Sequence, residues 1–160
     1  MSVQKTMLLA TVLSVGIAAT MAWAADDPFV GTWKLNIAKS KYNPGPGPKS
    51  GSNIFEPAPG GLKLIVRNED TQGKPTSFER VEVYDGKTHT AHGEGRLGPD
   101  AFSMKRVDPY TIEIVNYKNG KVSSRTTRKV SKDGKTLTST SKGTDAEGHP
   151  IEEFRFFEKQ

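Results

Sequence analysis

The fold is decided by residues 117–155, which read YKNGKVSSRTTRKVSKDGKTLTSTSKGTDAEGHPIEEFR. Asn119-Gly120, Asp133-Gly134 and Asp145-Ala146-Glu147-Gly148 interrupt this stretch about every dozen residues, which leaves one strand length between them. Asn-Gly and Asp-Gly are strong hairpin signals, because type I′ turns need residues that tolerate a positive φ. The stretch therefore predicts antiparallel strands joined by tight turns.

Similar turn signals extend towards the N-terminus as far as residue 59. They are Pro59-Gly60-Gly61, Gln72-Gly73-Lys74, Asp85-Gly86-Lys87 and Asp108-Pro109. A long antiparallel meander loses its exposed edges by closing on itself, so we predict an all-β fold, a single antiparallel up-and-down β-barrel of eight to ten strands. The expected strands lie near residues 29–37, 50–57, 62–70, 76–84, 87–92, 101–107, 111–117, 121–131, 135–143 and 150–158.

Only the first connection is long. Residues 38–49 contain the run Pro44-Gly45-Pro46-Gly47-Pro48, which cannot continue a helix or a central strand. We expect this segment to run as an extended or irregular loop over one end of the barrel.

Residues 1–24 differ from the rest of the chain. Lys5 is their only charge, an apolar run extends from Met7 to Met21, and Ala22-Trp23-Ala24 offers small residues before a cleavage point. This pattern predicts a secretory signal peptide cleaved after Ala24, and hence a periplasmic or secreted protein. The alternative is an uncleaved anchor, but the run is shorter than the roughly 20 residues of a membrane span, so we expect no stable span after cleavage. Residues 25–160 have the size of one barrel domain.

Composition narrows the classes of partner. The formal net charge of +5 comes from basic and acidic residues that are interspersed along the chain, so we do not expect nucleic acid as a partner. The sequence contains no cysteine, which excludes disulfides, thiolate sites and a lipid anchor on cysteine. We expect no cofactor.

Alternation along the strands predicts which side chains face the interior, because successive residues point to opposite faces. Trp33, Leu35 and Ile37 share one face of the first strand, and Leu62, Leu64 and Val66 share one face of the third. Ile112 and Ile114 make the same pattern in the seventh strand. We expect these faces to form the core.

Three arginines share a face with apolar neighbours and are expected to point inwards. Arg106 follows Phe102 and Met104, Arg128 lies between Val122 and Val130, and Arg155 shares its face with Ile151 and Phe157. A guanidinium is costly to bury, so one interpretation is a wet cavity or an internal anion. The other is that each arginine pairs with an internal carboxylate such as Glu82 or Glu153, or extends to solvent at a barrel end.

Two short motifs resemble those of the calycin superfamily. Phe29-Val30-Gly31-Thr32-Trp33-Lys34-Leu35 is similar to the Gly-x-Trp opening strand of lipocalins and fatty-acid-binding proteins. Arg155-Phe156-Phe157-Glu158-Lys159 is similar to the closing Arg-x-Tyr-Glu-Lys strand of the fatty-acid-binding branch, and Arg128-Lys129 resembles an arginine-containing strand before it. The resemblance implies a lipocalin-like or fatty-acid-binding-protein-like barrel.

The resemblance also implies a site. In that family two arginines and a tyrosine hold the ligand carboxylate, and they match Arg128, Arg155 and the position of Phe157. The tyrosine hydroxyl is therefore missing here. The segment 38–49 is too short and too rich in prolines and glycines for the family's helical lid, and the exported chain is closer to a bacterial lipocalin-like protein.

Other motifs carry weaker signals. Residues 93–98 spell G-x-G-x-x-G, but Pro99-Asp100 and another strand follow, so we interpret them as a glycine-rich loop. His89 and His92 are spaced H-x-x-H and would face opposite sides of a regular strand, so we predict no metal site there. The adjacent pairs Glu69-Asp70 and Glu152-Glu153 each split across two faces, and we expect no catalytic residues and no enzyme.

The leading hypothesis is an exported lipocalin-like barrel that binds a small hydrophobic or amphipathic molecule, with an anionic group held by its arginines. Arg106, Arg128, Arg155 and Phe157 are the candidate ligand-binding residues. The alternative is a structural module with a filled barrel that meets a protein partner in the cell envelope. A barrel enzyme is a third hypothesis.

Overall fold

The computed structural model describes residues 27–93, 97–145 and 147–160, and the predicted signal peptide lies outside these ranges. Within them the chain forms eleven strands and one short 3-10 helix, η1. The bounds are β1 Gly31–Leu35, η1 Ile37–Lys39, β2 Lys41–Asn43, β3 Ser50–Ala58, β4 Gly61–Glu69, β5 Pro75–Val83, β6 Asp85–Thr90, β7 Ala101–Asp108, β8 Thr111–Lys118, β9 Lys121–Val130, β10 Thr136–Thr144 and β11 Pro150–Lys159.

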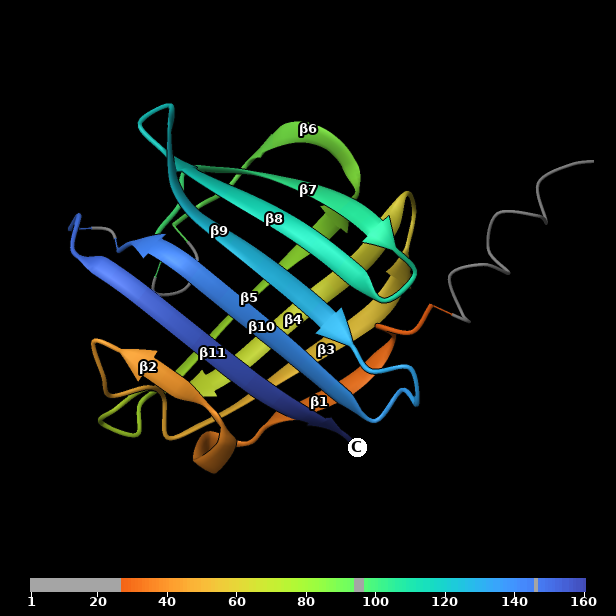
Figure 1. Ribbon diagram of the computed structural model, residues 1–160, viewed down its shortest axis with the longest axis horizontal. Coiled ribbons are helices and arrows are strands. Elements are labelled where there is room, and N and C mark those ends of the chain that lie inside the picture. Colours follow the sequence, from red (N-terminus) through yellow and green to blue (C-terminus); the bar gives the residue numbers. More distant parts are fainter. Residues whose placement is uncertain (1–26, 94–96, 146) are drawn as a thin grey trace, which may run out of the picture.

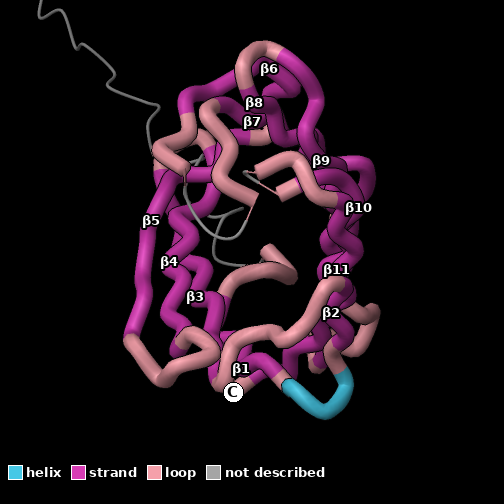
Figure 2. Tube along the Cα trace, turned by 90° about the vertical axis from the view of Figure 1, so that its left-hand side faces the viewer, coloured by secondary structure: helices cyan, strands magenta, loops and turns pink. Residues whose placement is uncertain are grey.

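Ten of these strands form a nearly closed antiparallel barrel, which confirms the predicted fold class. Their order is β5-β4-β3-β1-β11-β10-β9-β8-β7-β6, so β3 to β5 and β6 to β11 form two runs of sequence neighbours, and β1 joins the two runs by pairing with β3 and β11. Strands β8 to β11 pass in front of β3 to β5 in Figure 1, and Figure 2 shows these two groups as opposite walls. The interior lies between the two walls.

The turns are held by aspartate side chains. At five of them an aspartate carboxylate accepts a hydrogen bond of 2.7–3.1 Å from the backbone N–H two residues later. Asn119 and Gly120 both have positive φ, as the type I′ expectation requires, whereas at Asp133-Gly134 only the glycine does. The Asp-Gly signals therefore act through side-chain capping more than through backbone geometry. The five aspartates are Asp70, Asp85, Asp108, Asp133 and Asp145.

The barrel is interrupted between β5 and β6. The signal Asp85-Gly86-Lys87 lies where the chain passes between these strands, yet they are not hydrogen-bonded to each other. Instead, the register of β6 on β7 shifts between Asp85 and Thr88. Gly86 thus belongs to an irregularity in β6 and not to a hairpin.

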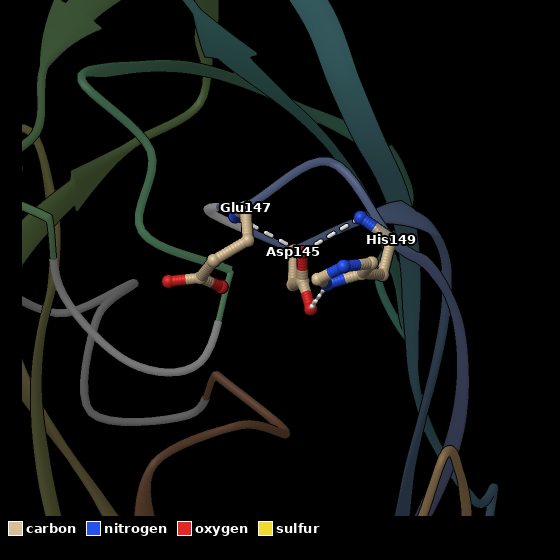
Figure 3. Close-up of side chains that lie close together, drawn as sticks. All are labelled: Asp145, Glu147 and His149. Carbon is tan, nitrogen blue, oxygen red and sulfur yellow. Dashed lines mark hydrogen bonds and ion pairs between the residues drawn. The ribbon is translucent and has the colours of Figure 1, made fainter.

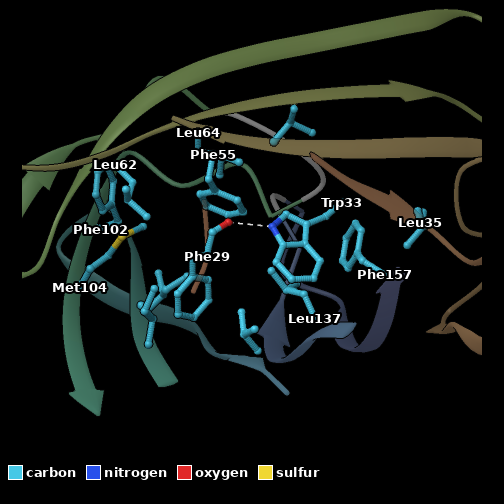
Figure 4. Packing of buried hydrophobic residues seen from close by; sticks show 14 of the residues in the cluster. Phe29, Trp33, Leu35, Phe55, Leu62, Leu64, Phe102, Met104, Leu137 and Phe157 are labelled. Carbon is cyan, nitrogen blue, oxygen red and sulfur yellow. Dashed lines mark hydrogen bonds between the residues drawn. The ribbon is translucent and has the colours of Figure 1, made fainter. Parts of the chain in front are cut away.

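Apolar side chains fill one end of the barrel. Trp33 and Phe29 are fully buried, and the indole Nε1 of Trp33 donates a 2.7 Å hydrogen bond to the carbonyl of Phe29 (Figure 4). The ammonium of Lys159 lies 5.0 Å from the centre of the Trp33 ring. Gly31, at φ +127°, lies so close to Lys159 that a Cβ would be 2.9 Å from its Cε. Because L side chains rarely adopt this φ, a glycine is favoured where β1 pairs with the end of β11, whereas the flexible Lys159 side chain could move aside.

The predicted long connection contains more structure than an irregular loop. β1 ends at Leu35, and Ile37 begins the 3-10 helix with 40% of its surface exposed, so the expectation that Ile37 joins the core is wrong. β2 then pairs with the first half of β11, where Tyr42 lies opposite Glu153. This short strand extends the barrel wall beyond the end of β1. Residues 44–49 follow it as a loop.

Among the described residues, no helix is long and apolar enough to cross a membrane.

Candidate functional site

A cavity of about 790 Å³ occupies the half of the barrel that the apolar core leaves open. Leu64 and Val66 of β4 belong to the core and also line the cavity, while Leu62, earlier on the same strand, belongs to the core alone. Loop residues from positions 46–48, 70–71 and 97–99 surround its other end. This volume lies in the range of sites for small molecules and argues against a barrel filled by its own side chains.

Both walls of the cavity mix apolar and polar side chains. The apolar Leu64, Val66 and Phe78 line the β4–β5 wall, together with the polar Asn68, Thr76, Ser77 and Arg80. On the opposite wall, formed by β8 to β11, most of the lining side chains are polar or charged. They are Asn116, Thr126, Arg128, Ser139, Glu153 and Arg155, together with the apolar Ile114 and Phe157.

Arg128, Ser139 and Arg155 form one row across this polar wall. Ser139 is the direct register partner of Arg128 on β9 and of Arg155 on β11. Arg128 is 6% exposed and Ser139 is 3% exposed. The Ser139 hydroxyl, the Arg128 Nε and the Arg155 Nε are buried and have no hydrogen-bond partner within the described part of the chain. The row, which we call the donor row, thus presents three unused donors to the cavity.

Internal carboxylates lie beside both arginines of the donor row. The Nη1 of Arg128 donates a 2.7 Å hydrogen bond to Glu82, which is fully buried. The Nε of Arg155 lies 3.7 Å from a carboxylate oxygen of Glu153, a distance beyond a hydrogen bond. Arg155 is therefore held by an ion pair, whereas Arg128 is held by a direct hydrogen bond.

Glu82 is the centre of a buried charge cluster below the cavity. Arg80 donates to one of its oxygens at 3.1 and 3.3 Å, and Arg128 donates to the other. Burial raises the pKa of the Glu82 carboxyl, but the two guanidiniums outweigh burial and the net shift is downward. The hydroxyl of Tyr84 lies 3.5 Å from Glu82, and burial, followed by the Glu82 charge, raises the pKa of Tyr84. Glu82 therefore stays ionised and Tyr84 stays protonated near neutral pH.

Arg106 points inwards but does not line the cavity. Its guanidinium donates a 2.6 Å hydrogen bond to Asp27 and lies 4.6 Å from the centre of the Tyr84 ring and 5.2 Å from that of Phe29. This places Arg106 at the end of the barrel that the core fills. The sequence left open that an inward arginine pairs with an internal carboxylate. Arg106 forms such an ion pair, and its partner is Asp27.

Phe157 lies on the polar wall, where it belongs to the buried core cluster and also lines the cavity. The sequence interpretation missed Arg80, although Arg80 alternates with Phe78 and Glu82 along β5. That alternation could have identified Arg80 as an inward-pointing residue. No sequence pattern could have identified Ser139, because it lies in a strand rich in serine and threonine.

The histidines have separate environments. His89 hydrogen-bonds Asp85 at 2.9 Å and stacks on Phe102, whereas His92 lines the cavity. In the β10–β11 turn, side-chain atoms of Asp145, Glu147 and His149 lie within 4.8 Å of one another (Figure 3). Asp145 accepts hydrogen bonds from the backbone N–H groups of both other residues, so turn capping explains the cluster.

The G-x-G-x-x-G motif lies partly outside the described residues, which omit positions 94–96. Gly98 is followed by Pro99, Asp100 and then β7, without an intervening helix. A dinucleotide fingerprint needs a helix N-terminus at this point, and the described residues do not provide one.

Comparisons with known proteins give matches in structure alone. No protein-family model and no curated protein matches the sequence. The structure is similar to As-p18, an extracellular fatty acid binding protein, with 17% identity, 84% of this chain and 97% of that chain covered, and a TM-score of 0.53. A second similar structure is the zebrafish ileal bile acid-binding protein complexed with cholic acid, with 12% identity, coverage of 83% and 99%, and a TM-score of 0.47. The chain therefore shares the fold of As-p18, and its described strands form a nearly closed antiparallel β-barrel.

Proposed function

We propose that this protein binds a small amphipathic anion in its cavity and performs no chemistry on it. The donor row carries the proposal, because three buried donors that have no hydrogen-bond partner among the described residues face a cavity of about 790 Å³. Buried polar groups normally have a partner, so unused donors at a cavity wall indicate a ligand that supplies acceptors. Apolar side chains on the facing wall would hold the rest of the molecule.

The charges around the cavity favour a ligand with one negative charge. Among the described residues, three guanidiniums, those of Arg80, Arg128 and Arg155, lie close to two buried carboxylates, Glu82 and Glu153. These five groups together carry one net positive charge, while Asp70 lines the cavity at its loop end. A ligand carboxylate or sulfonate would balance this positive charge by charge-assisted hydrogen bonds.

Two further observations favour binding without catalysis. The lowered pKa of Glu82 makes it a poor proton acceptor, and two arginines already hold its oxygens. The similar structure As-p18 is a fatty acid binding protein. Arg106 has no part in the proposed site, because Asp27 binds it at the other end of the barrel.

Arg155→Gln tests this function, with calorimetric titration of oleate into the mature protein. Removing the guanidinium should weaken binding roughly tenfold to a hundredfold, the range expected for charge-assisted hydrogen bonds. Arg125→Gln is the matched control, since Arg125 is exposed on β9. Equal affinity of the wild type and Arg155→Gln for oleate, or no binding of any anionic amphiphile, would contradict the proposal.

We further propose that the chain is exported, with its signal peptide removed after Ala24. The charge and apolar pattern of residues 1–24 supports export, as does the similarity to a protein described as extracellular. Residue 25 should be the N-terminus of the protein recovered from the cell envelope or the medium. An N-terminal sequence starting at Met1 would contradict cleavage.

A further inference from the structure

We infer that Glu153 sets how much negative charge the cavity accepts, and that its carboxylate limits the ligand to one negative charge at the donor row. This inference rests on the proposed function and assigns the charge selectivity of that site to one residue. Glu153 does not belong to the donor row. It is a specificity-determining residue, because it acts on the ligand through the charge that it places beside Arg155.

Glu153 lies on the polar wall, one rung away from the donor row. Its register partners are Ser141 on β10 and Tyr42 on β2, whereas Arg155 pairs with Ser139. Glu153 and Arg155 are two positions apart on β11, so they point to the same face and lie about 7 Å apart along the strand. β11 begins beside β2 and the loop that follows it, and it ends beside β1 at the filled end. Glu153 is therefore closer to the loops than Arg155 is.

The Glu153 carboxylate is buried in the wall of the cavity. Glu153 is 4% exposed and lines the cavity. One of its oxygens lies 3.7 Å from the Nε of Arg155, which is within ion-pair distance but beyond a hydrogen bond. This Nε has no hydrogen-bond partner within the described ranges. Glu153 thus offsets the charge of Arg155 without using its Nε–H donor, which a ligand can take.

The other carboxylates near the cavity are placed differently. Glu82 does not line it, and Arg80 and Arg128 hold the two Glu82 oxygens by hydrogen bonds of 2.7–3.3 Å. Asp70 lines the cavity at the loop end, where it accepts hydrogen bonds of 2.8 and 2.9 Å from two backbone N–H groups of the β4–β5 turn. Among the described residues, Glu153 is therefore the cavity-lining carboxylate that lies beside the donor row.

A carboxylate at this position opposes a second negative charge on the ligand. Like charges a few ångströms apart in a poorly hydrated site repel each other strongly. One ligand charge is tolerated, because the three guanidiniums near the cavity outnumber the two buried carboxylates beside them by one. Without the Glu153 charge this excess would rise from one positive charge to two. The site would then favour a dianionic group over a monoanionic one.

The experiment compares oleyl alcohol, oleate and oleyl phosphate. They share a hydrocarbon tail and carry, at pH 8, no charge, one negative charge and about two negative charges. Calorimetric titration should show that the wild type binds oleate at least as tightly as oleyl phosphate. Glu153→Gln should tighten the binding of oleate roughly tenfold and that of oleyl phosphate roughly a hundredfold, because the repulsion scales with the ligand charge. Its affinity for oleyl alcohol should not change. Glu153→Asp, which keeps the charge, should retain the wild-type preference.

Glu152→Gln is the matched control, because it removes the same charge one residue away on the outer face of β11. There Glu152 pairs with Lys142 at 2.7 Å, and both side chains are more than half exposed. Water and salt screen an exposed charge, so the control should bind all three ligands like the wild type. Near-ultraviolet circular dichroism of each variant verifies that the barrel is folded.

The outcomes separate the inference from the proposed function. If Glu153→Gln leaves the preference between oleate and oleyl phosphate unchanged, or if Glu152→Gln shifts it equally, the inference is overturned, while the proposed function stands on the effect of Arg155→Gln. Tighter binding of oleyl phosphate than of oleate by the wild type overturns the inference even where Glu153→Gln does not fold. If neither anion binds, both are overturned.

Discussion

At the scale of single residues, we expect the Ser139 hydroxyl to favour ligand binding while lowering the stability of the free protein. This hydroxyl is buried between two arginines without a hydrogen-bond partner in the described ranges, which costs free energy in the unliganded protein. Ser139→Ala should therefore stabilise the free protein by up to about 1 kcal/mol and weaken the binding of oleate several-fold. Urea unfolding and calorimetric titration measure the two effects.

Ser123 provides the control for this prediction. Its hydroxyl is likewise buried without a partner among the described residues, but it does not line the cavity. Ser123→Ala should raise stability by a similar amount and leave binding unchanged. If Ser139→Ala destabilises the free protein, or if both variants bind alike, then Ser139 has no special relation to the ligand.

At the scale of elements, the loop after β2 borders one end of the cavity. Gly47 packs against the face of the Tyr42 ring, and a Cβ at this position would overlap the ring. Both residues line the cavity. Gly47→Ala should displace the ring or the loop and speed ligand dissociation roughly threefold to tenfold, because changes at a site act mainly on the dissociation rate.

Gly45→Ala is the control in the same loop. A Cβ there would lie 3.4 Å from the Tyr42 carbonyl oxygen, which is close to an ordinary contact. Stopped-flow displacement of a fluorescent fatty acid gives the rates. Equal dissociation from both variants would show that the loop does not limit ligand release.

At the scale of the whole molecule, several carboxyl groups make stability depend on pH in the same direction. The guanidiniums of Arg128 and Arg80 outweigh burial and lower the pKa of Glu82 from its ordinary 4.5. Backbone N–H groups lower the pKa of Asp70, Asp108 and Asp145 from 3.8. The unfolded chain therefore binds protons more tightly than the folded one in this range.

It follows that the free energy of unfolding is fully retained above pH 4.5 and falls as the pH drops through the folded-state pKa values of these groups. Urea midpoints measured from pH 7 to pH 3 should be level down to about pH 5 and then decline steeply. A midpoint that stays constant or rises below pH 4 would show that these carboxyls are not stabilised by folding.

Local chemistry determined the fold. Each turn signal consists of two or three consecutive residues, and an aspartate cap needs only the backbone N–H groups of the next few residues. The strand positions and the meander could therefore be predicted without tertiary information. Alternation likewise predicted that Arg128 and Arg155 point inwards, because side-chain direction is a property of the strand itself. The prediction failed at Ile37, where the chain leaves the strand for a 3-10 turn.

The partners of those inward side chains could not be predicted, because they come from distant parts of the chain. Arg128 and Glu82 lie 46 residues apart, and Arg106 and Asp27 lie 79 apart, so no local pattern could pair them. The donor row depends on the register of β9, β10 and β11, which long-range strand pairing sets. Local sequence patterns were thus sufficient to predict an antiparallel barrel with inward arginines. Long-range contacts were needed to place Arg106 at one end and Arg128, Ser139 and Arg155 beside a cavity.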